Sequence, residues 1–296
     1  MLCILYVIAV GTLLGVAGLL VERALPATTT ARRWVWCPVI AITMTVPPIY
    51  RAKHTAAVTD MVGGSSGDIL SEVINQTWLI ASGMLVIWGL ATAARVWLLV
   101  NRSRTDGNAS SIDGVPIVVT DSIGPATVGV LRSRVVVPRW VLALPSVQRR
   151  YVLRHEDEHR KSHDALLLFI ASLALILTPW NLALWWQLRR LRLAVEMDCD
   201  NRVVSALGDP NAYGDLLFKV AQAASRGPRL QPAFLGTGLL EHRLTALLAP
   251  VPLRQAQRLL LPAVACVLLF VVLSMPHPVL SLKPVASSQH SHTAPR

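Results

Sequence analysis

Four stretches of this sequence are apolar over roughly the length that a helix needs to cross a bilayer, and this feature restricts the fold more than any other. They are residues 1–21, 34–50, 77–100 and 259–275. A soluble domain covers its surface with charged side chains, yet only 15% of these residues are charged and 53% are hydrophobic. The sequence therefore predicts a mostly α-helical protein of the lipid bilayer, with about four transmembrane helices.

The first apolar run has two interpretations. No Lys or Arg precedes residues 1–21, and the run is longer than the apolar core of a signal peptide. Both points favour a retained helix with its N-terminus outside. A signal peptide cleaved near Ala24–Ala27 is the alternative.

The basic residues indicate which way the chain crosses the membrane. The formal net charge is +11, and of the 28 Lys and Arg residues 10 lie in residues 101–163 and 10 in residues 187–258. Cytoplasmic loops of membrane proteins collect Lys and Arg in this way. No basic stripe is interleaved with base-stacking aromatic residues, so we expect no direct contact with nucleic acid. The interpretation places residues 101–258 in the cytoplasm of a multi-pass protein of the plasma or inner membrane.

Residues 155–159 read His-Glu-Asp-Glu-His and carry the chemistry. On a helix, His155 and His159 lie one turn apart on the same face, so both imidazoles can reach one ion, with Glu156 beside it. Ser146 is expected to cap this helix. Two imidazoles and one carboxylate suit Zn²⁺, which leaves a fourth position for water, and Glu156 would act as the catalytic base.

The expected third ligand lies on a second helix. Glu196 and Asp200 are also four residues apart, on a helix that is expected to stop at Gly208 and Pro210. A liganding carboxylate followed one turn later by a second carboxylate is a gluzincin arrangement, in which the second carboxylate holds a ligand histidine by its free N–H. We therefore predict Glu196 as a metal ligand and Asp200 as the carboxylate that accepts a hydrogen bond from a ligand histidine.

Cysteine residues are not expected to take part. Cys3, Cys37 and Cys266 lie in apolar runs and Cys199 stands alone in a polar one. Since none forms a Cys-x-x-Cys pair, neither a disulfide framework nor cysteine ligation of zinc is expected.

The metal site forces an unusual path on residues 165–188, which are apolar enough to be taken for a further span. If Glu196 shares an ion with His159, both ends of this segment must lie on one side of the membrane. Pro179-Trp180-Asn181 interrupts the run, so one helix can descend, break at Pro179 and return. We predict a re-entrant or membrane-leaning hairpin. A true span, with Glu196 stranded opposite the histidines, is the alternative.

A small β-sheet is predicted ahead of the histidine helix. Residues 115–119, 126–130 and 134–137 are rich in β-branched residues. The edge of such a sheet could bind the backbone of a substrate, or the sheet could be purely structural. Tyr213 and His242 are candidate transition-state stabilisers, although a lone Tyr or His is more often structural.

The chain resembles the BlaR/MecR-type membrane metallopeptidases, metallopeptidase family 56. The resemblance covers about residues 78–250, and the flanking spans are similar only in hydropathy. It rests on Gly129-Val130-Leu131-Arg132, Val135-Val136-Val137-Pro138, His155–His159 with Asp164, Thr178-Pro179-Trp180, Arg189-Arg190-Leu191-Arg192 and Glu196 with Cys199-Asp200.

The resemblance implies a zinc metalloendopeptidase in signal transduction, an antirepressor that cleaves itself or a transcriptional repressor, for example one of the winged-helix class. Only about 20 residues follow the last span, without a Ser-x-x-Lys motif, so we expect no β-lactam sensing by this chain. Two alternatives stay open. One is a quality-control or prenyl-type membrane zinc protease. The other is a non-catalytic membrane sensor or scaffold, which the charged Asp157-Glu158 pair inside the motif keeps in view.

These features divide the chain into four parts. We expect three transmembrane helices in residues 1–100 and a gluzincin-like zinc peptidase domain in residues 101–258, including the membrane hairpin 165–188. The last transmembrane helix is expected at residues 259–275 and a disordered tail at residues 276–296. The sequence does not indicate an oligomeric state.

Overall fold

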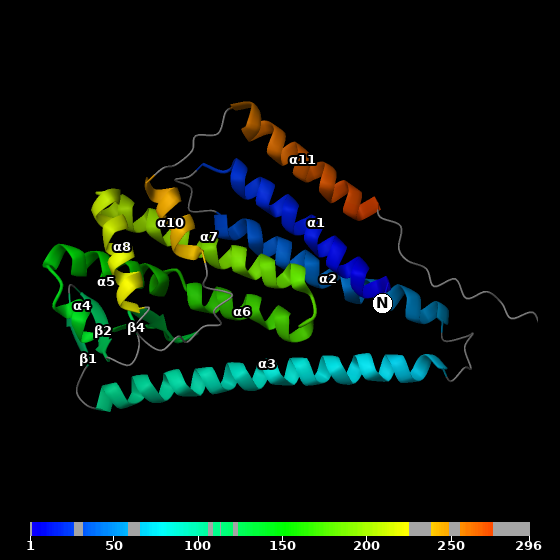
Figure 1. The fold of residues 1–296 in the computed structure, drawn as a ribbon, viewed down its shortest axis with the longest axis horizontal. Coiled ribbons are helices and arrows are strands. Elements are labelled where there is room, and N and C mark those ends of the chain that lie inside the picture. Colours follow the sequence, from blue (N-terminus) through cyan, green and yellow to red (C-terminus); the bar gives the residue numbers. More distant parts are fainter. Residues whose placement is uncertain are drawn as a thin grey trace, which may run out of the picture.

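The computed structural model describes residues 2–26, 32–58, 66–105, 109–112, 114–120, 124–224, 238–248 and 255–274. Four long helices run beside a smaller mixed domain (Figure 1): α1 (Leu2–Ala24), α2 (Arg32–Val58), α3 (Ser66–Thr105) and α11 (Gln255–Ser274). The rest of the chain forms β1 (Ala109–Ile112), β2 (Val115–Val119), β3 (Ala126–Val128), β4 (Arg134–Val137), α4 (Arg139–Leu142), α5 (Ser146–Lys161), α6 (Asp164–Leu177), α7 (Leu182–Leu207), α8 (Pro210–Ala224) and α10 (Leu239–Leu248).

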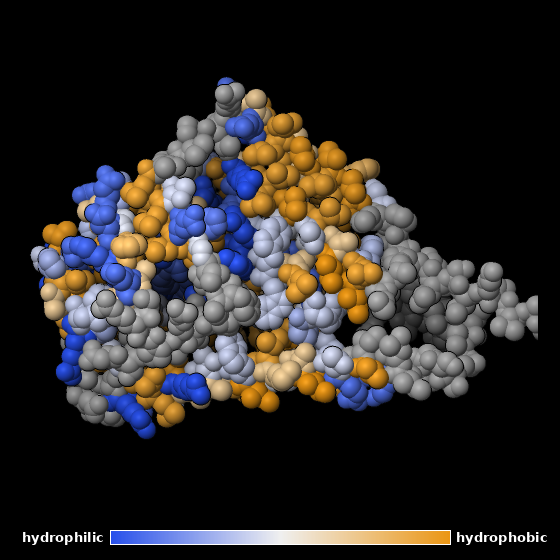
Figure 2. Space-filling view, viewed as in Figure 1, coloured by the Kyte–Doolittle hydropathy of each residue, from blue (hydrophilic) through white to orange (hydrophobic). Residues whose placement is uncertain are grey.

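Three helices in the described part of the chain are long and apolar enough to cross a membrane. They comprise Ile4–Ala24, Asn75–Arg102 and Gln255–Val272, and they match three of the predicted spans. Figure 2 shows apolar side chains gathered over α11, where Leu259, Val267 and Phe270 are exposed. Large apolar side chains that face outward along a whole helix are those that lipid covers. The chain is therefore a membrane protein.

The predicted span 34–50 is not confirmed in the same way. It lies within α2, which begins at Arg32 and Arg33 and continues to Val58. This helix is not among the three helices that are long and apolar enough to cross a membrane. The segment between the predicted spans 34–50 and 77–100 contains the end of α2 and the start of α3, so both helices extend beyond the predicted limits. Residues 59–65 lie outside the described residues. The predicted tail at 276–296 lies outside the described residues.

The small sheet has the strand order β1-β2-β4-β3. Strands β2 and β4 are parallel, and β1 and β3 flank them in antiparallel pairs. The three predicted strands are confirmed, although β3 ends at Val128. Strand β1 was missed because Ala109–Ile112 is polar and short. Strand β3 is an edge strand and packs against α5, which places it beside the histidine helix.

Helices α6 and α7 form a helical hairpin with its turn at the predicted place, and the position of this hairpin in the membrane stays a prediction. Helix α6 ends at Leu177, Pro179 lies in the turn, and the side chain of Asn181 accepts a hydrogen bond from the backbone N–H of Leu184 to cap α7. Helix α7 then returns without a break to Gly208, as expected. The 14 residues of α6 and the 14 residues from Leu182 to Val195 give two legs of about 21 Å at 1.5 Å per residue. Equal legs bring Glu196 back to the level of Asp164.

Glycines on α1 let the returning leg of the hairpin pack closely. A Cβ atom on Gly11 would lie 3.0 Å from Ala183 Cβ, and one on Gly15 would lie 2.2 Å from Cζ3 of Trp186. The buried side chain of Gln187 donates to the carbonyl of Gly11 at 2.8 Å and to Thr43 Oγ1 on α2 at 3.0 Å. The hairpin is therefore held between α1 and α2, and the buried Nε2 of Gln187 finds both of its acceptors inside the protein.

The far end of α6 is held by α3. Trp78 Nε1 donates to the carbonyl of Leu177 at 2.8 Å, and Ser82 Oγ donates to the carbonyl of Ile176 at 2.7 Å. The last carbonyls of a helix lack partners within the helix. The side chains of Trp78 and Ser82 supply these missing hydrogen-bond partners at the turn of the hairpin.

We predict that Gly15→Ala destabilises the protein, because the added methyl group must displace the indole of Trp186. Overpacking of this kind costs about 1–3 kcal/mol, so the thermal unfolding midpoint in detergent should fall. Gly83→Ala on α3 is the matched control, since a Cβ there meets no atom within 4 Å. Equal midpoints for the two variants would contradict this packing.

Candidate metal centre

Helix α5 presents the two histidines side by side, as their spacing predicted. The Nε2 atoms of His155 and His159 lie 3.2 Å apart. The helix begins at Ser146, but its N-cap is Pro145 and no side chain caps it, so the predicted capping role of Ser146 was wrong. His163 adopts a left-handed conformation with φ of 54°. His163 therefore forms the turn between α5 and α6, and the hairpin begins at the next residue, Asp164.

Glu196 lies across from the histidines, on the face of α7 that packs against α5. Its Oε2 atom is 3.6 Å from His155 Nε2 and 3.9 Å from His159 Nε2. A tetrahedral Zn²⁺ with bonds of 2.0–2.1 Å holds its ligand atoms about 3.3–3.4 Å apart. The three atoms are thus placed close to the corners of such a site, and the donor set fits a divalent metal.

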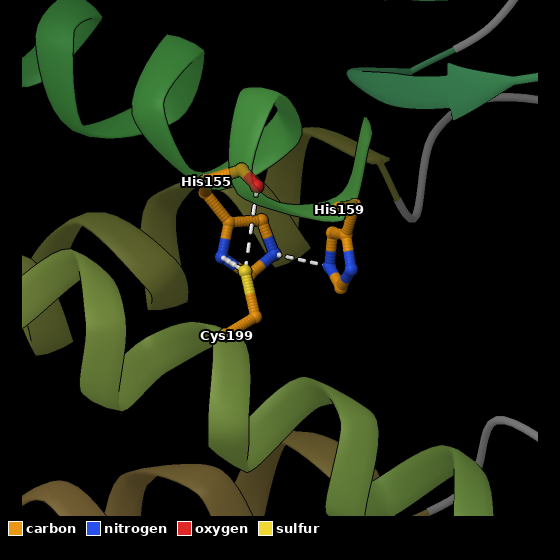
Figure 3. A group of neighbouring side chains, drawn as sticks. All are labelled: His155, His159 and Cys199. Carbon is orange, nitrogen blue, oxygen red and sulfur yellow. Dashed lines mark hydrogen bonds between the residues drawn. The ribbon is translucent and has the colours of Figure 1, made fainter. Parts of the chain in front are cut away.

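Cys199 lies beside the same histidines, which the sequence analysis did not expect. The ligand atoms of His155, His159 and Cys199 all lie within 4.8 Å of one another (Figure 3). However, Cys199 Sγ is 3.4 Å from His155 Nδ1, whereas His159 and Glu196 face His155 Nε2. One ion cannot bind both nitrogens of one ring. We therefore favour the set with Glu196 and regard Cys199 as a thiol packed behind the first imidazole.

The surroundings of the imidazoles favour positive charge. Burial lowers the pKa of His155, but the Cys199 thiol and the Glu196 carboxylate outweigh it and raise that pKa to about 10. Burial also opposes the charged form of His159, yet Cys199, Asp164 and Glu196 raise its pKa well above the usual value. For Glu196, burial is outweighed by Arg243 and the two histidines, which hold its pKa well below the usual range. A cation bound between these groups would satisfy the same anionic surroundings.

Each histidine has a partner on the nitrogen that faces away from Glu196. His159 Nδ1 is 2.8 Å from Asp164 Oδ2, and His155 Nδ1 is 2.9 Å from the hydroxyl of Tyr213. Tyr213 donates in turn to Asp200 Oδ1 at 2.7 Å, and that oxygen is 3.5 Å from His155 Nδ1. Such partners fix the orientation and tautomer of a ligand histidine. Asp200 therefore lies where the sequence placed it, although its contact with His155 runs mainly through Tyr213.

Neither predicted transition-state stabiliser is placed for that role. The Tyr213 hydroxyl lies behind His155, bonded to Asp200, and its side chain is 1% exposed. His242 is exposed. Its neighbour Arg243 is the residue that enters the site. Arg243 Nη1 lies 3.0 Å from Glu196 Oε2, and Arg243 Nη2 is 2.7 Å from Asp200 Oδ1. Sequence reasoning missed Arg243, because an arginine on an amphipathic helix carries no signal of burial.

Glu156 lies against the edge strand of the sheet. Thr127 Oγ1 on β3 is 2.6 Å from the Glu156 carbonyl oxygen and 3.2 Å from Glu156 Oε2. The carboxylate is thereby held next to β3, where a peptide added to the sheet edge would lie.

The other two acidic residues of the motif are paired outside the centre. Asp157 binds Arg160 and Lys161, both at 2.6 Å. Glu158 binds Arg154 at 2.6 Å and Arg202 at 2.9 Å. The charged pair that distinguishes this motif therefore forms ion pairs on the flanks of α5 and leaves the two imidazoles free for an ion.

Comparisons with known proteins identify the family of this chain. The sequence profile of the family described as BlaR1 peptidase M56 matches residues 5–247. The match begins within α1, so the family likeness extends further toward the N-terminus than residue 78, where the sequence analysis placed its start. The regulatory protein BlaR1 of Bacillus licheniformis is 26% identical over 111 residues, which are 37% of this chain and 18% of that protein. Because the family profile covers most of its length, this chain belongs to the M56 family of peptidases.

Proposed function

We propose that this chain is an integral-membrane zinc metalloendopeptidase with a gluzincin-like site. The observation that carries the proposal is the placement of His155 Nε2, His159 Nε2 and Glu196 Oε2 at 3.2–3.9 Å from one another. These residues would hold the ion. When bound, zinc would polarise the scissile carbonyl and lower the pKa of a water molecule.

The residues of the chain would perform the remaining steps. Glu156 is the carboxylate next to the ligand pair and would take a proton from the attacking water, then pass it to the leaving amine. Tyr213 and Asp164 would keep the two imidazoles oriented. Arg243 would balance the charge of Glu196 and Asp200, which are buried together with it. The substrate would add to the free edge of β3, beside Glu156 and Thr127.

We further propose that the activity is regulated and directed at a protein in the cytoplasm. The relative from Bacillus licheniformis is named a regulatory protein, and in this chain Arg33 at the start of α2 pairs with Asp164, the hydrogen-bond partner of His159. A substrate of the family type would be the chain itself or a transcriptional repressor. The concentration of Lys and Arg in residues 101–163 and 187–258 supports the cytoplasmic placement of this part of the chain.

We predict that the purified protein binds about one zinc ion per chain, since the three ligands form one site. His155→Ala and His159→Ala should each abolish stoichiometric binding, measured by elemental analysis in chelator-free buffer. His163→Ala is the control, because His163 lies in the turn after α5 and should leave zinc content unchanged. A wild-type protein without zinc would contradict the ligand assignment.

The roles of the acidic residues can be separated. Glu156→Gln should keep zinc but lower peptidase activity by roughly 10²–10⁴-fold, because it removes a base and no ligand. Glu196→Ala should weaken zinc binding itself. Asp200→Ala should lower zinc affinity or the rate of peptide cleavage by about 10–100-fold, as is usual when a hydrogen-bond partner of a ligand is removed. The assignment fails if Glu196→Ala binds zinc normally while Glu156→Gln loses it. Zinc without any peptidase activity in the wild type would favour the non-catalytic scaffold.

The hairpin predicts a specific labelling pattern. In a background without native cysteines, single cysteines at positions 162 and 201 should react from the same side, the cytoplasmic one. Cysteines at Gly64 and Ser288, which lie outside the described residues, should react from the other side. Pro179→Leu should favour a continuous helix and weaken zinc binding. Labelling of positions 162 and 201 from opposite sides would exclude Glu196 as a ligand.

A further inference from the structure

The first turn of α2 touches the metal centre. Arg33 Nη1 forms a hydrogen-bonded ion pair with Oδ1 of Asp164. The other oxygen of that carboxylate, Oδ2, lies 2.8 Å from His159 Nδ1. A single carboxylate thus joins an arginine of α2 to one of the two ligand imidazoles.

Arg33 also contacts the helix that carries the third ligand. Its backbone N–H donates to Asp198 Oδ2 at 3.3 Å, and its Nε lies 3.8 Å from the same oxygen. Asp198 is two residues from Glu196 on α7. The side chains of Asp164, Asp198 and Arg33 are 3%, 0% and 13% exposed. Since a buried carboxylate is costly without its cation, the position of this turn and the position of both acidic residues depend on each other.

A second cation faces Asp164, but it comes from a different element. Arg202 Nη2 is 3.7 Å from Asp164 Oδ2, while Arg202 Nε binds Glu158 at 2.9 Å. Arg202 belongs to α7 and moves with Glu196. Arg33 belongs to α2, which extends from the metal centre toward the opposite end of the long helices (Figure 1). Of these two cations, only Arg33 would move away from Asp164 if α2 were displaced.

We propose that Arg33 is a positioning residue, which makes the geometry of the metal centre depend on how the first turn of α2 is docked. With Arg33 in place, Asp164 is held so that Oδ2 accepts from His159 Nδ1, and His159 Nε2 is directed toward His155 and Glu196. When α2 shifts, Asp164 loses the nearer of its two cations and turns toward Arg202, and His159 loses the acceptor that fixes it. A displacement of the first turn of α2 thereby lowers metal affinity. This inference rests on the proposed function, since it concerns the same zinc site.

The test uses the full chain in detergent micelles, with Zn²⁺ affinity measured against a competing chelator and the visible spectrum of bound Co²⁺ as a readout of coordination geometry. Arg33→Gln should weaken zinc binding about 10–100-fold and alter the cobalt spectrum, and Arg33→Lys should recover part of the loss. Arg32→Gln is the matched control. Arg32 is the adjacent residue and contacts Met197 Sδ at 3.8 Å and the carbonyl of Pro26 at 3.5 Å. This control should change zinc affinity by less than about twofold, since Arg32 holds no partner of a ligand histidine.

A double variant shows whether Arg33 acts through Asp164. If it does, Arg33→Gln with Asp164→Asn should bind zinc no more weakly than Asp164→Asn alone. The double variant removes both charges of the pair and leaves no uncompensated buried charge. It can therefore still be measured if Arg33→Gln alone unfolds the metal-free protein. Independent, additive losses overturn the inference, as does an Arg33→Gln protein with the zinc affinity and cobalt spectrum of Arg32→Gln. In both of those cases the wild type still binds zinc and the proposed function stands. A wild type that binds no zinc overturns both.

Discussion

Two helices that are separated by an apolar segment must meet at one site, and this constraint shapes the rest of the structure. His155 and His159 lie on α5, and Glu196 lies on α7, with α6 and a tight turn between them. These three side chains can converge only if the intervening chain goes out and comes back over the same distance. Pro179 supplies the turn, and the two legs are of matching length. The packing of α1, α2 and α3 around the hairpin follows from the need to hold that path.

The same constraint explains why polar groups are buried far from the histidine pair. A hairpin that turns among apolar helices exposes carbonyls at the end of its first leg and polar side chains along its second leg. Trp78 and Ser82 bond to the carbonyls of Leu177 and Ile176, and Gln187 bonds to α1 and α2. Without these partners each group would cost several kcal/mol in an apolar environment. The surrounding helices therefore stabilise the turn as well as enclosing it.

Much of this arrangement could be predicted from sequence because it follows from local spacing. The four-residue spacings of His155 with His159 and of Glu196 with Asp200 fix which side chains share a helix face. The proline in an apolar run fixes where the hairpin turns. Three of the four expected spans and three strands were recognised from hydropathy and β-branched residues.

The contacts that complete the site could not be predicted in this way. Arg33, Arg243 and Thr127 each come from a separate element, and each reaches the centre only through tertiary packing. Tyr213 was correctly expected near the histidines, but its hydroxyl contacts His155 Nδ1 and is not placed to stabilise a transition state. The sequence does not indicate which side of an imidazole a hydroxyl occupies. Cys199 was set aside for lack of a paired cysteine, although its place one turn after Glu196 on the same helix face already brings it near the histidines.

The origin of these contacts bears on how such a site could be controlled. The cations beside the centre come from three parts of the chain: Arg33 from α2, Arg202 from α7 and Arg243 from α10. Buried ion pairs contribute little net stability, but breaking one leaves an uncompensated charge and is strongly unfavourable. A centre assembled this way is intact only when every contributing helix is docked. A displaced helix would therefore not need to reach a bound ion to disturb it, since it would take one cation away from a buried carboxylate.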